Sequence, residues 1–368
     1  MKELKNTHIC LMLLFLITIS SLSAQQSTNK FFTIIVDPGH GGTDSGTPGT
    51  GRHKASEKDI ALDVSLALGK MLKNNIKNTK IVYTRTRDVF PTLNSRAIKA
   101  NKADADLFIS IHCNAQPLKN RRSGGPAFGS ETFVLGLHKN AANLEVAKRE
   151  NSVIKLEENY KETYEGFDPD SPESLIGMTL MQEEYLDQSI EIASYIENEF
   201  VTTAKRRSRG VKQAGFWVLT KTYMPSVLVE LGFLTNLKEE NFLNSQKGKD
   251  VMTLSLFNAI QKYINKRVNV ESKDKTINSN LIYKDVIFKV QIAASSKKLP
   301  LKPYNFKGIT NLSIENTGGL FKYFTGNTNN YEEIIAIKKL AKDKGYPKCY
   351  VVAYKNGIKV NLNSILKK

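Results

Sequence analysis

Short apolar runs alternate with segments of helical periodicity along most of the chain. Residues 31–36 form an apolar run that ends in a Pro-Gly turn, which predicts a buried strand. Residues 57–72 place apolar side chains at helical spacing behind Ser56 and Asp59, a pair typical of a helix start. The pattern repeats, with strands expected at 80–84, 106–111, 131–135 and 226–229 and helices at 93–101, 183–200 and 252–264. We therefore predict an α/β domain over residues 30–266, a mostly parallel twisted sheet flanked by helices.

A polar stretch without apolar periodicity, residues 267–283, is expected to be a linker to a second unit. In that unit, residues 284–360, the pattern predicts a small α+β domain with strands at 286–292, 319–325 and 349–354 and a helix at 331–344. Within the first domain, residues 141–174 exceed what a minimal α/β domain needs. We interpret them as a partly helical insertion that lies over one face of the domain.

The N-terminus has the order of a secretory signal. Lys2 and Lys5 precede an apolar run over residues 9–19, and small residues follow up to Ala24. The run is shorter than the roughly 20 residues that span a bilayer, so a signal peptide over residues 1–24 is favoured over an anchor. We expect an exported protein of the periplasm or cell envelope. Cys113 and Cys349 remain after cleavage, and we expect both to be free thiols.

The formal net charge is +17, which favours an acidic partner such as nucleic acid, anionic lipid or an anionic polymer. Export argues against nucleic acid, so the expected partner is a polymer of the cell envelope.

Three residues that bind metals or transfer protons end predicted strands. His40 and His112 each follow a strand directly, and Glu230 ends another. The carboxyl ends of parallel strands open onto one crevice, where ligands bind. Glu57 lies in the first turn of the helix that follows a glycine-rich loop, which places it beside His40. Two histidines and one carboxylate are a known catalytic zinc set that leaves a position for water, and a nearby Glu230 would accept the proton of that water. This chemistry fits hydrolysis of an amide.

Each of these residues also has a simpler interpretation. A histidine after a strand is often a hydrogen-bonded structural residue. Glu57 fits an acid favoured by a helix dipole, and Glu230 fits a buried charge with a basic partner. These alternatives remain open on spacing alone.

Four ordered motifs resemble the zinc-dependent N-acetylmuramoyl-L-alanine amidases of the Amidase_3 family. They are VDPGHGG at 36–42, SEKDI at 56–60, ADLFISIHCNA at 105–115 and PSVLVELGFLTN at 225–236. The resemblance implies that His40, Glu57 and His112 bind one Zn²⁺ ion and that Glu230 is the catalytic carboxylate. It also implies cleavage of the amide between N-acetylmuramic acid and L-alanine in peptidoglycan, during wall turnover or daughter-cell separation.

The insertion has a counterpart in some division amidases, where a helix covers the zinc site and an acidic side chain reaches the metal until a protein activator displaces it. The resemblance makes Glu145, Glu150, Glu157 and Glu158 the autoinhibitory candidates. A solvated surface helix of mixed charge is the alternative.

The C-terminal unit resembles a SPOR domain, which binds glycan strands denuded of stem peptides. The similar segments include FKVQIAAS at 288–295 and GLFKYFTG at 319–326, whereas the two prolines within 297–303 depart from the expected first helix. Gln291 and Tyr323 are the candidates for contacting sugar on an exposed sheet face. The alternative is that such aromatic residues fill the core.

Two other functions use the same ligand types. One is a zinc peptidase or deacetylase acting on wall material, although Thr43 stands where a carboxypeptidase would place a glutamate three residues after His40. The other is a non-catalytic wall-binding protein, which the presence of all four expected residues disfavours.

Overall fold

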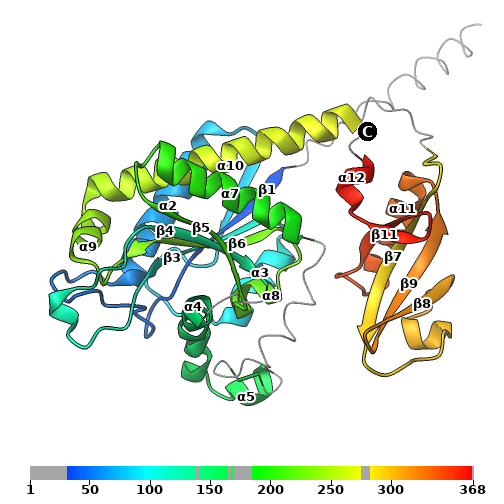
Figure 1. Ribbon diagram of the computed structural model, residues 1–368, viewed down its shortest axis with the longest axis horizontal. Helices are drawn as coiled ribbons and strands as arrows, with labels where there is room; N and C mark the ends of the chain where they lie inside the picture. The colour runs from blue at the N-terminus through cyan, green and yellow to red at the C-terminus, as the bar shows by residue number, and fades with distance from the viewer. Residues whose placement is uncertain (1–30, 137–140, 165–166, 169–184, 275–281, 367–368) are drawn as a thin grey trace, which may run out of the picture.

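The computed structural model describes residues 31–136, 141–164, 167–168, 185–274 and 282–366 (Figure 1). The predicted signal peptide lies outside the described residues. Of the helices within the described part of the chain, none combines the length and the apolarity needed to cross a bilayer.

The first domain is built on a six-stranded sheet in the order β2-β1-β3-β6-β4-β5. Neighbouring strands run parallel except β4 and β6, which pair antiparallel, so the predicted mostly parallel sheet is confirmed. Its strands are β1 (Phe32–Pro38), β2 (Thr79–Tyr83), β3 (Leu107–Asn114), β4 (Ser130–Leu135), β5 (Ser208–Ala214) and β6 (Ser226–Phe233).

Helices cover both faces of this sheet (Figure 1). The central strands carry apolar residues at consecutive positions, because both of their faces are buried. In β1, Ile34 and Val36 pack in the core with α2, α7 and α10, whereas Ile35 packs in the opposite core with α3, α4 and α8. The first group of helices is α2 (Glu57–Asn75), α7 (Leu186–Thr202) and α10 (Gln246–Asp274), and the second is α3 (Leu93–Lys102), α4 (Ala141–Asn151) and α8 (Trp217–Thr220).

Two boundaries differ from the sequence-based expectation. Helix α10 continues to Asp274, so the predicted linker at 267–283 begins as helix. A separate helix, α9 (Leu237–Asn244), precedes α10.

The insertion is ordered where the structure describes it. It holds α4, a 3₁₀ turn at Ser152–Leu156 and α5 (Tyr160–Thr163). Ile154, Tyr164 and Phe167 bury themselves against Trp217 in a small cluster of their own. The insertion is therefore anchored to the domain by apolar contacts, and is not only a solvated helix.

The C-terminal unit is a five-stranded antiparallel sheet in the order β11-β10-β7-β9-β8, with α11 (Tyr331–Asp343) on one face. A short helix, α12 (Leu362–Leu366), adds Ile365 to the same core, so this unit extends beyond the expected end at residue 360. The SPOR resemblance leads one to expect a first helix after β7, but the structure has a 3₁₀ turn at Pro303–Phe306. The strands are β7 (Val286–Ser295), β8 (Leu312–Thr317), β9 (Leu320–Thr328), β10 (Tyr350–Lys355) and β11 (Ile358–Val360).

Candidate metal centre

Two buried arginines hold the loop that presents His40. Arg96 donates hydrogen bonds of 2.7 Å to the carbonyl oxygens of Pro38 and His40, and Arg85 donates one of 2.7 Å to the carbonyl oxygen of Gly39. Asp37 compensates the charge of Arg96 at 2.7 Å. His40 has φ +57°, a left-handed conformation that is unfavourable for a residue with a side chain. The arginine contacts maintain that conformation at the end of β1.

Two glycines leave the space that the side chains of His112 and Glu57 occupy. A Cβ atom at Gly39 would lie 2.5 Å from the ring of His112. At Gly46, where φ is +60°, it would lie 2.5 Å from Oε2 of Glu57. Any larger residue at either position would push a side chain of the site out of place.

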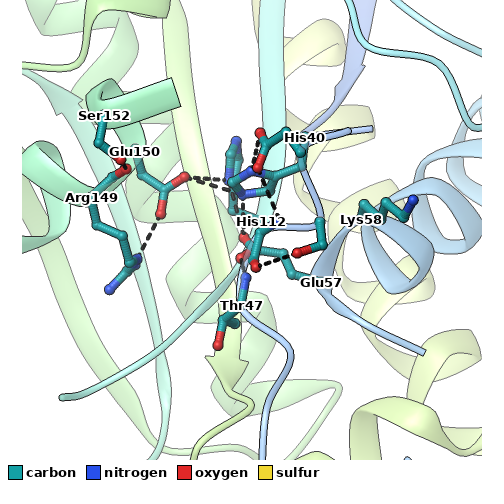
Figure 2. Close-up of polar contacts among 12 residues, drawn as sticks. His40, Thr47, Glu57, Lys58, His112, Arg149, Glu150 and Ser152 are labelled. Atoms are coloured by element: carbon teal, nitrogen blue, oxygen red, sulfur yellow. Dashed lines mark hydrogen bonds and ion pairs between the residues drawn. The ribbon is translucent and has the colours of Figure 1, made fainter. Parts of the chain in front are cut away.

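Four donor atoms converge on one point (Figure 2). Nε2 of His40 lies 3.0 Å from Oε1 of Glu57 and 3.2 Å from Oε2 of Glu150. Nδ1 of His112 lies 3.1 Å from Nε2 of His40, 3.1 Å from Oε1 of Glu57 and 3.0 Å from Oε2 of Glu150. The three predicted metal ligands are thus brought together, and α4 adds a fourth donor, the carboxylate of Glu150.

These distances fit a tetrahedral ion. Zinc bonds of about 2.0–2.1 Å in tetrahedral geometry keep two ligand atoms roughly 3.3 Å apart. The five donor–donor distances given above, 3.0–3.2 Å, are close to that value. The donor set of two imidazoles and two carboxylates is also one that zinc accepts.

Hydrogen bonds on the outer side of each ligand fix its orientation. Nδ1 of His40 lies 2.7 Å from Oδ2 of Asp44, which leaves Nε2 as the atom facing the centre. The backbone N–H groups of Thr47 and Cys113 donate to the two oxygens of Glu57 at 2.8 and 2.9 Å. Carboxylates behind a ligating histidine are typical of metal sites. Sequence reasoning missed Asp44, although its position four residues after His40 was the available signal.

The carboxylates make this pocket attractive to cations. Burial alone would lower the pKa of His112, but the charge and hydrogen bond of Glu150 raise it to about 9. Burial alone would raise the pKa of Glu57, but the neighbouring His40 lowers it to about 2. Positive charge is therefore stabilised at the point where the four donor atoms meet.

Glu230 lies one strand away from His112 and is fully buried. Among the described residues neither of its carboxylate oxygens has a hydrogen-bond partner, and its nearest cation is Nη2 of Arg149 at 3.5 Å. Burial, reinforced by the charge of Glu150, raises its pKa well above the usual range, although Arg149 opposes this shift. A buried carboxyl group with a raised pKa beside a cation site is suited to accept and return a proton.

Of the four candidate glutamates, Glu150 is the one that reaches the centre. Glu145 and Glu158 are exposed, and Glu157 accepts a hydrogen bond of 2.6 Å from the hydroxyl of Tyr164. The neighbour of Glu150, Arg149, was not foreseen as a site residue.

Arg149 holds α4 against the end of β3. It donates to the carbonyl oxygen of Ala115 at 2.9 Å and to Oδ1 of Asn114 at 3.1 Å, and it pairs with Glu150 at 3.0 Å. Consecutive residues of α4 thus contact the catalytic candidate Glu230 and the candidate metal ligands.

The expected glycan contact at Tyr323 is wrong. Tyr323 is fully buried against Phe306, and its hydroxyl accepts a hydrogen bond of 2.6 Å from the backbone of Leu299. Gln291 is also buried, with 9% of its surface exposed. Tyr323 instead fills the core, as the alternative interpretation expected, because every second side chain of a strand faces the core.

The opposite face of the C-terminal sheet carries a different aromatic pair. Phe324 and Tyr354 form a cluster separate from the α11 core, and Nζ of Lys289 lies 5.7 and 4.8 Å from their ring centres.

Comparison with known proteins agrees with this geometry. Residues 34–262 match the Amidase_3 family, described as N-acetylmuramoyl-L-alanine amidase. The chain belongs to the Amidase_3 family. It is therefore an amidase of that class, whose family substrate is peptidoglycan, and the matched range holds the candidate metal ligands and Glu230.

Individual relatives cover the same region. The uncharacterised protein YqiI of Bacillus subtilis is 32% identical over 231 residues, which is 63% of this chain and 84% of YqiI. The N-acetylmuramoyl-L-alanine amidase AmiA of Salmonella typhimurium is 30% identical over 233 residues, which is 62% of this chain and 75% of AmiA. The crystal structure of an N-acetylmuramoyl-L-alanine amidase from Clostridium difficile 630 is 28% identical, with a TM-score of 0.48, and the match covers 65% of this chain and 99% of that one.

Proposed function

We propose that this amidase uses one zinc ion, held by His40, Glu57 and His112, to cleave the bond between N-acetylmuramic acid and L-alanine in peptidoglycan. The observation that carries the proposal is the convergence of these three side chains within 3.0–3.1 Å of one another beside a buried Glu230. Family membership supplies the substrate class.

The division of labour follows from the positions of the residues. A zinc ion in this site would acidify a water molecule and polarise the amide carbonyl. Glu230 accepts the proton of the attacking water and returns it to the leaving amine nitrogen. Its burial favours the protonated form and so the return step. The backbone donors on Glu57 keep that carboxylate oriented as a ligand, so Glu230 is the carboxylate available for proton transfer.

We further propose that α4 inhibits the enzyme. Glu150 takes the fourth position around the centre, where water and the substrate carbonyl are needed, and Arg149 pairs with the proton-transferring Glu230. An activating protein that displaces α4 would release both contacts at once. Apolar anchoring of the insertion through Trp217 supports a stable closed state.

The remaining proposals concern where the enzyme acts. Residues 1–24 would export it to the periplasm or cell envelope, for wall turnover or daughter-cell separation. The C-terminal unit would act as a SPOR-like domain that binds denuded glycan. Phe324 and Tyr354 are buried, as Tyr323 is, so none of these rings is offered as the sugar contact. Comparing sedimentation of the full chain and of residues 31–274 with denuded glycan tests this binding directly.

Product analysis tests the proposed reaction. The zinc-loaded chain is incubated with a purified muropeptide, and the products are separated by mass. Free stem peptide and an intact muramyl sugar are expected. A released terminal amino acid would indicate a peptidase, and released acetate a deacetylase. Because α4 is proposed to inhibit, the absence of any product would indicate a non-catalytic wall-binding protein only if Glu150→Ala also releases none.

A further inference from the structure

A cavity of about 590 Å³ lies beside the metal centre, at the ends of β3, β4 and β5. Its volume is within the range of binding sites for small ligands. It shares Thr47, Ala115 and Arg149 as lining residues with a second cavity of about 370 Å³, which holds His40 and Glu57. The candidate metal centre is therefore flanked by two spaces, and Arg149 of α4 stands between them.

The larger cavity carries an excess of positive charge. Arg209 and Lys212, both on β5, pair with the same carboxylate of Glu131, which is only 2% exposed. One carboxylate cannot neutralise two cations, and both cations remain partly exposed, at 28% and 18%. The lining also includes Glu145 of α4, so two carboxylates face the four cations Arg121, Arg149, Arg209 and Lys212. Arg121 on the opposite wall is exposed, and within the described ranges no carboxylate lies at ion-pair distance from it. The cavity is thus prepared for an anion.

The smaller cavity differs in character. Its outer wall includes the apolar residues Pro48, Val153 and Leu156. Of the described residues that line it, Arg149 is the sole lysine or arginine. The two sides of the metal centre therefore favour different parts of a substrate.

Sheet register places the cations close to the reaction. His112, Glu230 and Glu131 are register partners on the neighbouring strands β3, β6 and β4. Adjacent strands lie about 4.8 Å apart, so Glu131 is one strand beyond the catalytic candidate and roughly 10 Å from His112 in the backbone. At about 3.5 Å per extended residue, that distance corresponds to roughly three residues of a bound peptide.

We propose that this cavity binds the free α-carboxylate of the second stem-peptide residue, with Arg121, Arg209 and Lys212 as the recognising cations. The inference rests on the proposed function. In peptidoglycan the residue after L-alanine is a glutamate linked through its γ-carboxyl group, and its α-carboxyl group is either free or amidated. The cavity selects the free acid and directs the peptide towards β5, which leaves the muramyl sugar on the other side of the metal centre, near Thr47 and Pro48. The three recognising cations lie outside α4 and so stay in place when that helix is displaced.

Binding of a reaction product tests the site without any need for turnover. The probe is the dipeptide L-alanyl-γ-D-glutamate, compared with its α-amide, titrated calorimetrically into the full zinc-loaded chain. Charge-assisted hydrogen bonds predict that the acid binds at least tenfold more tightly than the amide. Lys212→Gln and Arg121→Gln should each weaken binding of the acid about fivefold or more and leave the amide unchanged, whereas Lys212→Arg should retain the preference. Equal affinity of the wild type for both dipeptides would overturn the inference.

Turnover separates this inference from the proposed function. The matched substrates are N-acetylmuramoyl-L-alanyl-D-glutamate and its isoglutamine form. Cleavage of both with equal kcat/KM would leave the amidase intact and contradict the carboxylate site. Selective binding of the acid dipeptide without cleavage of either substrate, by the wild type or by Glu150→Ala, would contradict the amidase and leave the carboxylate site standing. Arg121 is exposed and unpaired among the described residues, so its variant should fold even if Lys212→Gln is unstable.

Discussion

Oε2 of Glu150 lies 3.0 Å from Nδ1 of His112, the separation expected of two ligands that share one tetrahedral ion. Glu150 belongs to α4, a helix of the insertion, whereas His112 lies near the end of the central strand β3. The contact makes occupation of the metal centre depend on the position of a helix that is not part of the sheet. It therefore couples the state of α4 to the accessibility of the metal.

Replacing Glu150 by alanine should raise amidase activity. Loss of its carboxylate frees the fourth position and removes contacts that keep α4 against the metal centre. We therefore expect the rate to rise roughly tenfold, which corresponds to about 1.4 kcal/mol. The measurement is the initial rate of stem-peptide release from purified peptidoglycan. Glu158→Ala is the matched control, because Glu158 lies in the same insertion but is exposed, and its rate should not change. A folded Glu150→Ala enzyme no faster than wild type would show that α4 does not inhibit.

Glu230→Gln should abolish turnover while preserving the fold. The substitution keeps the size of the side chain but removes the proton acceptor, and general-base catalysis contributes about 10²–10⁴-fold. We expect kcat to fall by that factor in steady-state assays. Because neither carboxylate oxygen has a hydrogen-bond partner among the described residues, thermal unfolding should change little. Near-normal kcat would show that another group transfers the proton.

Asp44→Asn should weaken metal binding without removing a ligand. Asp44 contacts the outer nitrogen of His40 at 2.7 Å, and loss of such a partner typically costs 10–100-fold in metal affinity. Competition with a zinc chelator measures this affinity. Asp63→Asn serves as a control, since Asp63 is exposed and pairs with Lys249 instead of a candidate metal ligand. Unaltered zinc affinity in Asp44→Asn would remove Asp44 from the support of the site.

Protein freed of metal should lose stability as the pH rises above neutrality. The pKa of His112 is raised from 6.5 to about 9 in the folded chain, after its buried carboxylate neighbours outweigh desolvation. A raised pKa stabilises the fold fully below pH 6.5, and this contribution is lost as the pH approaches 9. We expect the Tm of the chelated protein to fall by several degrees between pH 6.5 and 9, more than that of the zinc-loaded protein. Parallel Tm profiles for the two forms would argue against protonated imidazoles in the metal-free site.

Much of the first domain was accessible from sequence because its strands are buried on both faces. Apolar runs such as residues 31–36 mark central strands directly. Strand β5 was missed because it lies at the sheet edge and its residues, among them Arg209 and Lys212, are mostly polar. Hydrophobic pattern carries no signal for such a strand.

The site was partly predictable for a related reason. His40, His112 and Glu230 follow strands, so topology alone brought them to one edge of the sheet. Which of the four candidate glutamates reaches the metal centre depends on how α4 packs. The spacing of residues along the sequence does not determine that packing. Tyr323 was misassigned because alternation along a strand does not reveal which of its two faces a helix covers.

Zinc content of the purified chain is the most direct test of the shared metal site. Elemental analysis should find one zinc ion per wild-type chain, one in Glu230→Gln, and none in His40→Ala or His112→Ala. Retention of stoichiometric zinc after loss of either histidine, or its absence from the folded wild-type protein, would contradict a centre built from His40, Glu57 and His112.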